Sequence, residues 1–358
     1  MPTGRRLLME LRTTPYLRSL SWPHFLVWVL YKYTLRWPYR NLVLNNPITK
    51  HLDFDYFFSG RADATVKQVV DGSRRTARYR VYFAHFDPED TVQPYVFRYL
   101  DELLAYGGEI VFSTTSGMFP SPVLEQLKQR CCKIVFRKNS GLDFGSWGAA
   151  VSVDEDISGW AKGVLFANDS VLGPAPSLAE IFAEVDRCPV NTVLGLTDCY
   201  LHFHHLQSYF LFMPIGIYRH PEIKGFWKNI RCMRGKPGLI QRYEVGFSRL
   251  VVKSGFSIRA LYSFDRLLSV SYSQISEIDM AHRWKYNPSI HCWHQLFYVL
   301  KFPFVKKEIV TKQRCRAVTL ARLEKYLSEM KCDWVSSYIS EKAIPGKTDM
   351  EIIFREEN

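Results

Sequence analysis

The stretch KIVFRKNSGLDFGSWGAAVSV, residues 133–153, decides the fold of this 358-residue chain. Its first five residues are largely apolar and β-branched, which predicts a strand, and residues 145–153 predict a helix. A polar, glycine-rich loop joins the two and contains Asn139, Gly141, Asp143 and Gly145. A strand that leads through such a loop into a helix is typical of an α/β protein.

The same alternation repeats on both sides of this stretch. Expected strands cover residues 78–86, 109–115, 133–137, 163–168 and 191–197, and expected helices cover 91–108, 121–130, 145–153 and 176–185. Ser121 is the expected N-cap of the second helix, with Pro122 at its first position. Short apolar strands that alternate with helices indicate right-handed βαβ units. The sequence therefore predicts an α/β fold with a mostly parallel sheet.

Polar loops follow four of these strands, at residues 85–90, 113–119, 138–146 and 168–174. In open α/β sheets, ligands bind beyond the carboxyl ends of the strands, so we expect these loops, with His85, to share one rim. Glycine lets backbone N–H groups approach phosphate, and Asn139 and Asp143 can bind ribose hydroxyls. The alternative is a tight turn with an Asx cap. The loop matches neither the P-loop nor the G-x-G-x-x-G spacing.

A second polar signal, Asn168-Asp169-Ser170, ends the strand at 163–168. Mg²⁺ commonly binds through one or two carboxylates together with substrate phosphates. Asp169 is therefore a candidate ligand of a divalent cation, Mg²⁺ or Mn²⁺. The alternative is an ordinary turn that is closed by Gly173 and Pro174.

An ordered set of stretches carries a family resemblance. They are NSGLDFGSW (139–147), GVLFANDSVLGP (163–174), GLTD (195–198), HLQSYFLFM (205–213) and NPSIHCWHQLFYVLKFPFVKKEIV (287–310). Over about residues 78–310 the chain resembles the rhamnan synthesis protein F family. The resemblance implies a glycosyltransferase-like protein of bacterial surface-polysaccharide assembly, with a Rossmann-like fold of the GT-A type.

The resemblance also implies which residues form the site. On the nucleotide-sugar side it places Asn139, Gly141, Asp143, Gly145, Trp147, Asn168, Asp169, Ser170, Gly173 and Pro174. A second block of the resemblance contains His205, Gln207, Ser208 and Tyr209, of which Gln207, Ser208 and Tyr209 are expected on the acceptor side.

Glycosyl transfer requires a stabilised diphosphate leaving group, for which Arg137 and Lys138 are candidates, and usually a base that faces the acceptor hydroxyl. The candidate catalytic residues are Asp198, Glu244 and His205. For Glu244 the alternative is the favourable placement of an acid in the first turn of a helix.

The histidines of CYLHFHHLQSYF (199–210) raise a different possibility, a metal site. In an extended segment His202 and His204 would share one face and His205 the other. Cysteine and acidic ligands at zinc spacing are missing, so we interpret His205 and Gln207 as groups that contact a sugar.

The formal net charge of +12 is concentrated at the start of the chain. Residues 1–42 contain one acid, Glu10, and seven basic residues: Arg5, Arg6, Arg12, Arg18, Lys32, Arg36 and Arg40. Aromatic residues surround the last three, which share one helical face. This pattern favours contact with an anionic membrane surface, and the alternative is a helix that packs on the catalytic core. The apolar run at 25–31 is too short to cross a bilayer.

We therefore expect a membrane-associating segment and connector at 1–77, a glycosyltransferase-like domain at 78–310 and a helical extension at 311–358. The eight cysteines form no CxxC pair, which is consistent with reduced thiols on the cytoplasmic face of a bacterial inner membrane. The expected partners are a nucleotide-sugar donor, a lipid-linked saccharide acceptor and the membrane surface, and not nucleic acid. The alternative functions are sugar-phosphate transfer and a non-catalytic membrane-surface module.

Overall fold

The computed structural model describes Pro23 and residues 54–73, 77–154, 162–201, 203–271 and 286–347. The chain divides into two compact units, Met1–Phe57 and Phe58–Asn358. The basic, aromatic segment 1–42, apart from Pro23, lies outside the described residues. The fold described below is that of the second unit, with α5 (Phe54–Phe58) at the boundary.

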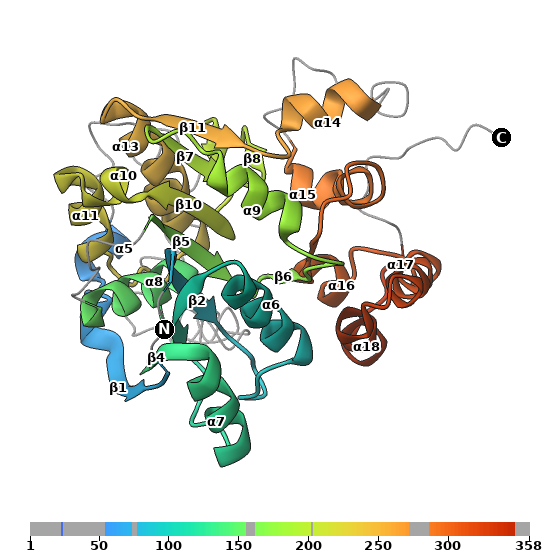
Figure 1. Cartoon of the computed structure of the whole chain (residues 1–358), viewed down its shortest axis with the longest axis horizontal. Helices are drawn as coiled ribbons and strands as arrows, with labels where there is room; N and C mark the ends of the chain where they lie inside the picture. Colours follow the sequence, from blue (N-terminus) through green and yellow to red (C-terminus); the bar gives the residue numbers. More distant parts are fainter. Residues whose placement is uncertain are drawn as a thin grey trace, which may run out of the picture. The chain divides into compact units, whose positions relative to one another are not determined.

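An eight-stranded sheet forms the centre of the described part of this unit (Figure 1). Its strands, in spatial order, are β1 (Val66–Asp71), β4 (Cys131–Arg137), β3 (Gly108–Thr114), β2 (Tyr79–His85), β5 (Gly163–Asn168), β10 (Phe210–Pro214), β7 (Thr192–Gly195) and β11 (Ser257–Ala260). The strands β4, β3, β2 and β5 are mutually parallel, as are β7 and β11. Only β1 and β10 run antiparallel to their neighbours. The predicted α/β fold class with a mostly parallel sheet is confirmed.

The helices between these strands also agree with the sequence pattern. They are α6 (Pro94–Ala105), α7 (Ser121–Arg130), α8 (Leu142–Val153) and α9 (Ala179–Asp186). The expected N-cap of α7 is wrong by one residue, because Ser121 is the first helical residue and Pro120 precedes it without a side-chain cap. Strand β1 lies in the segment that was expected to be a connector, so part of that segment belongs to the sheet.

Helices cover both faces of the sheet, as the fully buried strand β2 requires. On one face Tyr79, Val81 and Phe83 pack against α6, where the Phe83 and Tyr99 ring centroids lie 5.3 Å apart. On the other face Phe166 stacks on Trp227 of α11 (Pro221–Lys228), with ring centroids 3.8 Å apart.

The described part of the unit contains further helical elements. They are a 3₁₀ turn (Asp63–Thr65), α10 (Ile215–Arg219), α12 (Lys236–Leu239), a π-helical turn (Ile240–Val245), α13 (Gly246–Lys253), α14 (Phe264–Ser271), α15 (Pro288–His291), a second π-helical turn (Gln295–Val299), α16 (Lys307–Thr311), α17 (Ala317–Glu329) and α18 (Asp333–Lys342). Two short ladders join β6 (Val171–Leu172) to β12 (Val305–Lys306), and β8 (Asp198–Cys199) to β9 (His205–Leu206).

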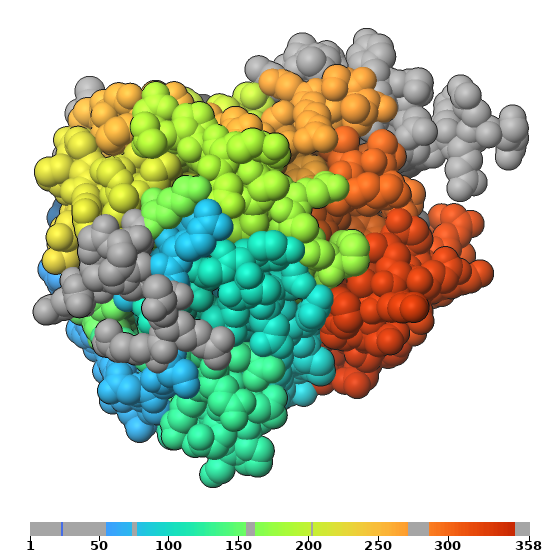
Figure 2. Space-filling view, in the orientation of Figure 1, coloured from blue at the N-terminus to red at the C-terminus, as the bar shows by residue number. Residues whose placement is uncertain are grey.

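The expected C-terminal helices pack directly on the α/β core, as Figure 2 shows for the red helices beside the teal α6. The rings of Tyr95 and Tyr338 lie 5.1 Å apart, and the Arg98 guanidinium lies 5.1 Å from the Trp334 ring. Among the described helices, none combines the length and the apolar character that crossing a membrane requires.

Candidate functional site

The carboxyl ends of β2 and β5 lie side by side, because these strands pair in parallel with Ala84 opposite Asn168. His85 therefore lies beside the segment 168–170, as predicted. Its Nδ1 is 3.0 Å from Thr114 Oγ1 at the end of β3, and its buried Nε2 has no hydrogen-bond partner in the described part of the chain. Burial lowers the pKa of His85, so the imidazole is neutral near pH 7.

Close packing explains Gly141, in the loop between β4 and α8, and Gly145, inside α8. Gly141 has a φ of 74°, and a Cβ there would lie 2.7 Å from the Cys232 Cα. A Cβ on Gly145 would lie 2.5 Å from the Ser140 carbonyl oxygen. Gly141 therefore serves a positive φ, which side chains other than glycine rarely adopt, and the approach of its backbone to a phosphate stays a prediction.

Arg137 is the last residue of β4, and its side chain packs against the protein within this loop and not on the ligand side. Its side chain is fully buried and donates to Thr65 Oγ1 at 3.1 Å and to Ser146 Oγ at 3.0 Å. It therefore holds the loop in place and does not face a phosphate. Lys138 and Asn139 are exposed at the loop's surface.

Asp143 projects from the first turn of α8 toward the end of β5. The Asn168 side chain donates to Asp143 Oδ2 at 2.9 Å, and Asn168 Oδ1 accepts from both the N–H and the hydroxyl of Ser170. Burial and then the nearby Asp169 raise the pKa of Asp143 to about 6, and Lys306 opposes this shift. The predicted grouping of Asp143, Asn168, Asp169 and Ser170 is thus present.

Two lysines that the sequence reasoning missed complete this cluster. Strand β12 pairs with β6, which brings Lys306 and Lys307 beside Ser170. The Lys307 Nζ is 3.1 Å from Asp169 Oδ2, while the Lys306 Nζ lies 4.1 Å from the Tyr209 ring centroid. Burial lowers the pKa of Lys306, and the carboxylates of Glu244 and Asp143 oppose this shift. The only sign of Lys306 and Lys307 in the sequence is that two adjacent lysines stand in the stretch 287–310, the last of those that carry the resemblance.

Glu244 also acts electrostatically on Lys306. It was predicted to open a helix, which is wrong, because α12, the π-helical turn and α13 form one continuous helical segment from Lys236 to Lys253. Glu244 Oε1 accepts the Ser208 N–H at 2.8 Å. Helical turns of the π type are rare in proteins, and those that occur are often found at functional sites. Glu244, Ser208 and Tyr209 therefore adjoin the charged cluster.

Asp198, His205 and Gln207 have internal partners. Asp198 accepts the Phe264 N–H at the start of α14 at 2.7 Å, and its other oxygen is 2.9 Å from His204 Nε2. His205 is buried, and its Nδ1 is hydrogen-bonded to the Phe203 carbonyl oxygen at 2.7 Å. These bonds favour a structural role over catalysis for Asp198 and His205. His202 lies outside the described residues.

Gln207, expected on the acceptor side, is also buried. Its Oε1 accepts from the Thr197 hydroxyl at 2.6 Å, and its Nε2 donates to Asn287 Oδ1 at 3.1 Å. Both ends of the amide are therefore committed to the protein, which favours a role in positioning the neighbouring strand β10.

Three residues that the resemblance placed on the nucleotide-sugar side lie elsewhere. Trp147 is fully buried among aromatic rings, and its Nε1 donates to the Ala167 carbonyl at 3.0 Å. Gly173 packs against the Pro303 carbonyl, and the Pro174 carbonyl accepts from Trp334 Nε1. These contacts stabilise the core and the C-terminal helices.

The site offers few ligands to the divalent cation for which Asp169 is the candidate ligand. Asp169, the predicted ligand, is paired with Lys307. Within the ranges that the structure describes, no group of three His, Cys, Asp or Glu residues could hold a metal ion. The described donor set therefore does not fit a divalent cation.

The fold and site define a class: an α/β protein with three carboxylates and two lysines at the carboxyl ends of its parallel strands. The chain belongs to the rhamnan synthesis protein F family, whose model matches residues 110–351. The match runs past residue 310, where the resemblance seen in the sequence ended, and includes α17 and α18.

Individual proteins are more distantly similar. The uncharacterized protein y4gN of Sinorhizobium fredii (strain NBRC 101917 / NGR234) is 27% identical over 219 residues, which cover 58% of this chain and 55% of the relative. This chain therefore spans about half the length of that curated relative.

Among solved structures, the galactosyltransferase LgtC, in complex with donor and acceptor sugar analogs, is 12% identical over 47% of this chain and 71% of its own, with a TM-score of 0.30. The glycosyltransferase GlyE of Streptococcus pneumoniae TIGR4 is 11% identical over 77% and 66%, with a TM-score of 0.38. Mouse xyloside xylosyltransferase 1 is 9% identical over 51% and 84%, with a TM-score of 0.30.

Proposed function

We propose that this protein is a glycosyltransferase that moves a sugar from a nucleotide-sugar donor to a saccharide acceptor in the synthesis of a bacterial surface polysaccharide. The observation that carries the proposal is the cluster of Asp143, Asp169, Lys306 and Lys307 at the strand ends, in a chain of the rhamnan synthesis protein F family. Rhamnose as the sugar and a lipid-linked acceptor are the finer parts of the proposal.

The two lysines provide the charge that a departing nucleoside diphosphate needs. As the bond between the anomeric carbon of the sugar and the diphosphate oxygen breaks, negative charge grows on the departing diphosphate, and preorganised cations stabilise that charge. Lys307 is pre-positioned by Asp169, and the carboxylates of Glu244 and Asp143 both act electrostatically on Lys306. Asn168, whose amide is bonded to Asp143 and Ser170, holds the Asp143 carboxylate, which would accept from a ribose hydroxyl.

Glu244 is the candidate base of the acceptor side. One of its oxygens is fixed by the Ser208 N–H, which orients the carboxylate beside Lys306. A base must reach the acceptor hydroxyl within hydrogen-bond distance. Among the three candidates from the sequence, Glu244 is the one in the charged cluster, whereas the Asp198 carboxylate caps α14.

The direct test is an assay of the purified full-length protein with a panel of nucleotide sugars, dTDP-rhamnose included, and a lipid-linked saccharide. We expect acceptor-dependent release of the nucleoside diphosphate and a glycosylated product, both measured by mass spectrometry. Release of the nucleoside monophosphate would instead identify sugar-phosphate transfer. Neither product with any donor would support the non-catalytic alternative.

The membrane part of the proposal rests on the seven basic residues and the aromatic rings of residues 1–42. The protein acts at the cytoplasmic face of the bacterial inner membrane, held there peripherally by this segment. Deletion of residues 1–42 is expected to move the protein from the membrane fraction to the soluble fraction, as measured by fractionation in low and high salt. Unchanged partitioning of the truncated protein would contradict this assignment.

A further inference from the structure

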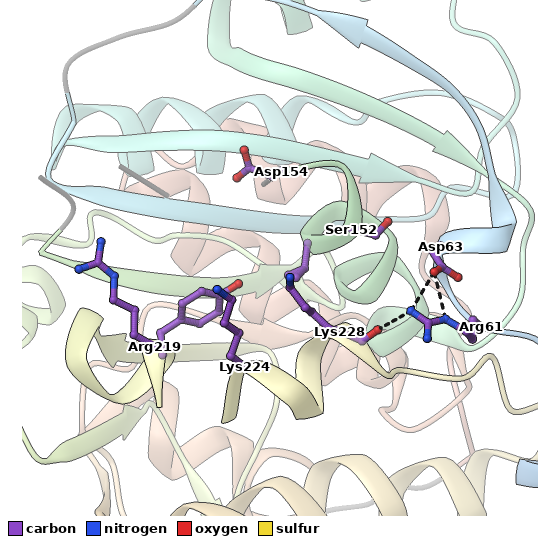
Figure 3. A pocket seen from close by; sticks show the side chains of 9 residues that line it. Arg61, Asp63, Ser152, Asp154, Arg219, Lys224 and Lys228 are labelled. Atoms are coloured by element: carbon purple, nitrogen blue, oxygen red, sulfur yellow. Dashed lines mark hydrogen bonds and ion pairs between the residues drawn. The ribbon is translucent and has the colours of Figure 1, made fainter. Parts of the chain in front are cut away.

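A separate cavity lies at the other end of α8 from the candidate site (Figure 3). It has a volume of ≈ 240 Å³ and is lined by Arg61, Asp63, Val151, Ser152, Asp154, Tyr218, Arg219, Lys224 and Lys228. The segment of α8 from Asp143 to Ser152 is about 14 Å long at 1.5 Å per residue. The cavity therefore cannot share a small ligand with the strand-end cluster.

The charges that line this cavity do not cancel. Four cationic side chains and two acids line it, which gives the lining a net charge of +2 (four minus two). The Asp154 carboxylate is already bonded outside this set, 3.0 Å from Arg80 Nε and 3.1 Å from the Tyr82 hydroxyl. Asp63 is paired with Arg61 at 2.9 Å. The acids are thus occupied, and the remaining field of the cavity is positive.

Two lysines of α11 supply the excess charge. Lys224 and Lys228 are four residues apart, so they share one face of the helix. Figure 3 shows both side chains extending from α11 on the same side of the cavity. Both lysines are exposed, and neither ammonium group forms an ion pair with a described residue. Arg61 donates to the Lys228 carbonyl at 3.2 Å, which fixes the end of α11 against the 3₁₀ turn.

We propose that this cavity binds a phosphate monoester or phosphodiester group, carried either by a membrane lipid or by a free small molecule. A phosphate monoester, with about −1.5 to −2 charges at pH 7, would balance the net charge of the lining, and a phosphodiester, with one negative charge, would balance half of it. Ammonium and guanidinium groups form strong, charge-assisted bonds to the oxygens of both. The volume is below the roughly 300–1,000 Å³ of pockets that enclose whole small-molecule ligands. The cavity therefore suits a phosphate with a small substituent rather than a nucleotide sugar.

The test is a calorimetric titration of the full-length protein with inorganic phosphate. The double variant Lys224→Ala/Lys228→Ala is expected to weaken phosphate binding by about tenfold or more, because it removes two charge-assisted contacts. The matched control Lys253→Ala/Lys325→Ala removes two exposed helical lysines elsewhere and should bind as the wild type does. Lys307→Met, which alters the strand-end cluster, should retain this binding as well.

Vesicles of phosphatidylcholine, with and without phosphatidylglycerol, distinguish the two sources of the phosphate. If the ligand is a lipid, the double variant sediments less with the anionic vesicles than the control does, and inorganic phosphate competes. If the ligand is a free phosphate ester, phosphate binding falls while vesicle binding equals that of the control. Equal phosphate affinity and equal vesicle binding in the double variant and the control would overturn the proposal.

Discussion

Replacing Lys307 by methionine is expected to lower the rate of sugar transfer by about 100-fold or more, equivalent to roughly 3 kcal/mol of transition-state stabilisation. The ammonium lies 3.1 Å from Asp169, in the cluster where the diphosphate charge would develop. Methionine keeps the aliphatic stem beside the Tyr95 ring but removes the charge. The measurement is kcat with a saturating donor, together with the melting temperature, because the variant leaves the buried Asp169 without its partner.

Two further variants separate catalysis from stability. Lys307→Arg preserves the charge and should recover much of the stability. Lys312→Ala removes a lysine five residues further on that pairs with Glu308 near the surface, and it should leave kcat unchanged. The same assays with Mg²⁺, with Mn²⁺ and with a chelator test the alternative role of Asp169. Full activity of Lys307→Met together with a strict requirement for a divalent cation would show that Asp169 holds a metal and that Lys307 does not act on the diphosphate.

The parallel half of the sheet could be predicted from the sequence because its signals are local. Each of β2, β3, β4 and β5 is a short apolar run that is followed by a polar loop and a helix, and each lies where the pattern indicated. Strand β1 escaped prediction because its side chains are largely exposed at the sheet edge, so it lacks an apolar run. The antiparallel direction of β10 is set by pairing with β5 and β7, which no local pattern reports.

Part of the site could also be predicted, because some of its residues follow local sequence signals. Asp143 and Asn168 follow strands that the sequence shows, and the topology brings them together. Lys307 reaches Asp169 across 138 positions of the chain through the β6–β12 ladder, a contact that depends on the whole fold. The family resemblance places Trp147 on the nucleotide-sugar side, but its side chain points from α8 into the core. Proximity along the chain could not reveal on which face of the helix it lies.

The second large effect is expected at Asp143, where activity and stability should move in opposite directions. The carboxyl has an ordinary pKa of 3.8 and a pKa of about 6 in the folded protein, where burial and then the charge of Asp169 disfavour its ionised form. The folded state therefore holds the proton more tightly than the unfolded state does. The stability that this group contributes is complete below pH 3.8 and is lost as the pH rises through 6. Above that pH the ionised carboxylate costs at most about 3 kcal/mol.

Asp143→Asn removes that cost while keeping the size of the side chain and an oxygen to accept from Asn168. The variant should therefore melt at a higher temperature than the wild type at pH 7.5 and at nearly the same temperature at pH 4. Donor affinity should nevertheless fall by about tenfold or more, because the carboxylate that would accept from the ribose is gone. The rise in the wild-type rate between pH 5 and 7, as Asp143 ionises, should be absent from the variant.

The matched control is Asp186→Asn, in a carboxylate whose pKa is shifted in the opposite direction. Burial alone would raise the pKa of Asp186, but hydrogen bonds from Lys162, Tyr79 and Arg78 lower it to about 2. Its stabilising contribution is present at neutral pH and is lost as the pH falls through 2, so the asparagine variant should melt at a lower temperature at pH 7.5. It lies at the opposite end of β2 from the site and should leave donor affinity unchanged. If Asp143→Asn kept wild-type donor affinity, the loop at 138–146 would be only a structural turn, because asparagine serves as well as aspartate in a cap.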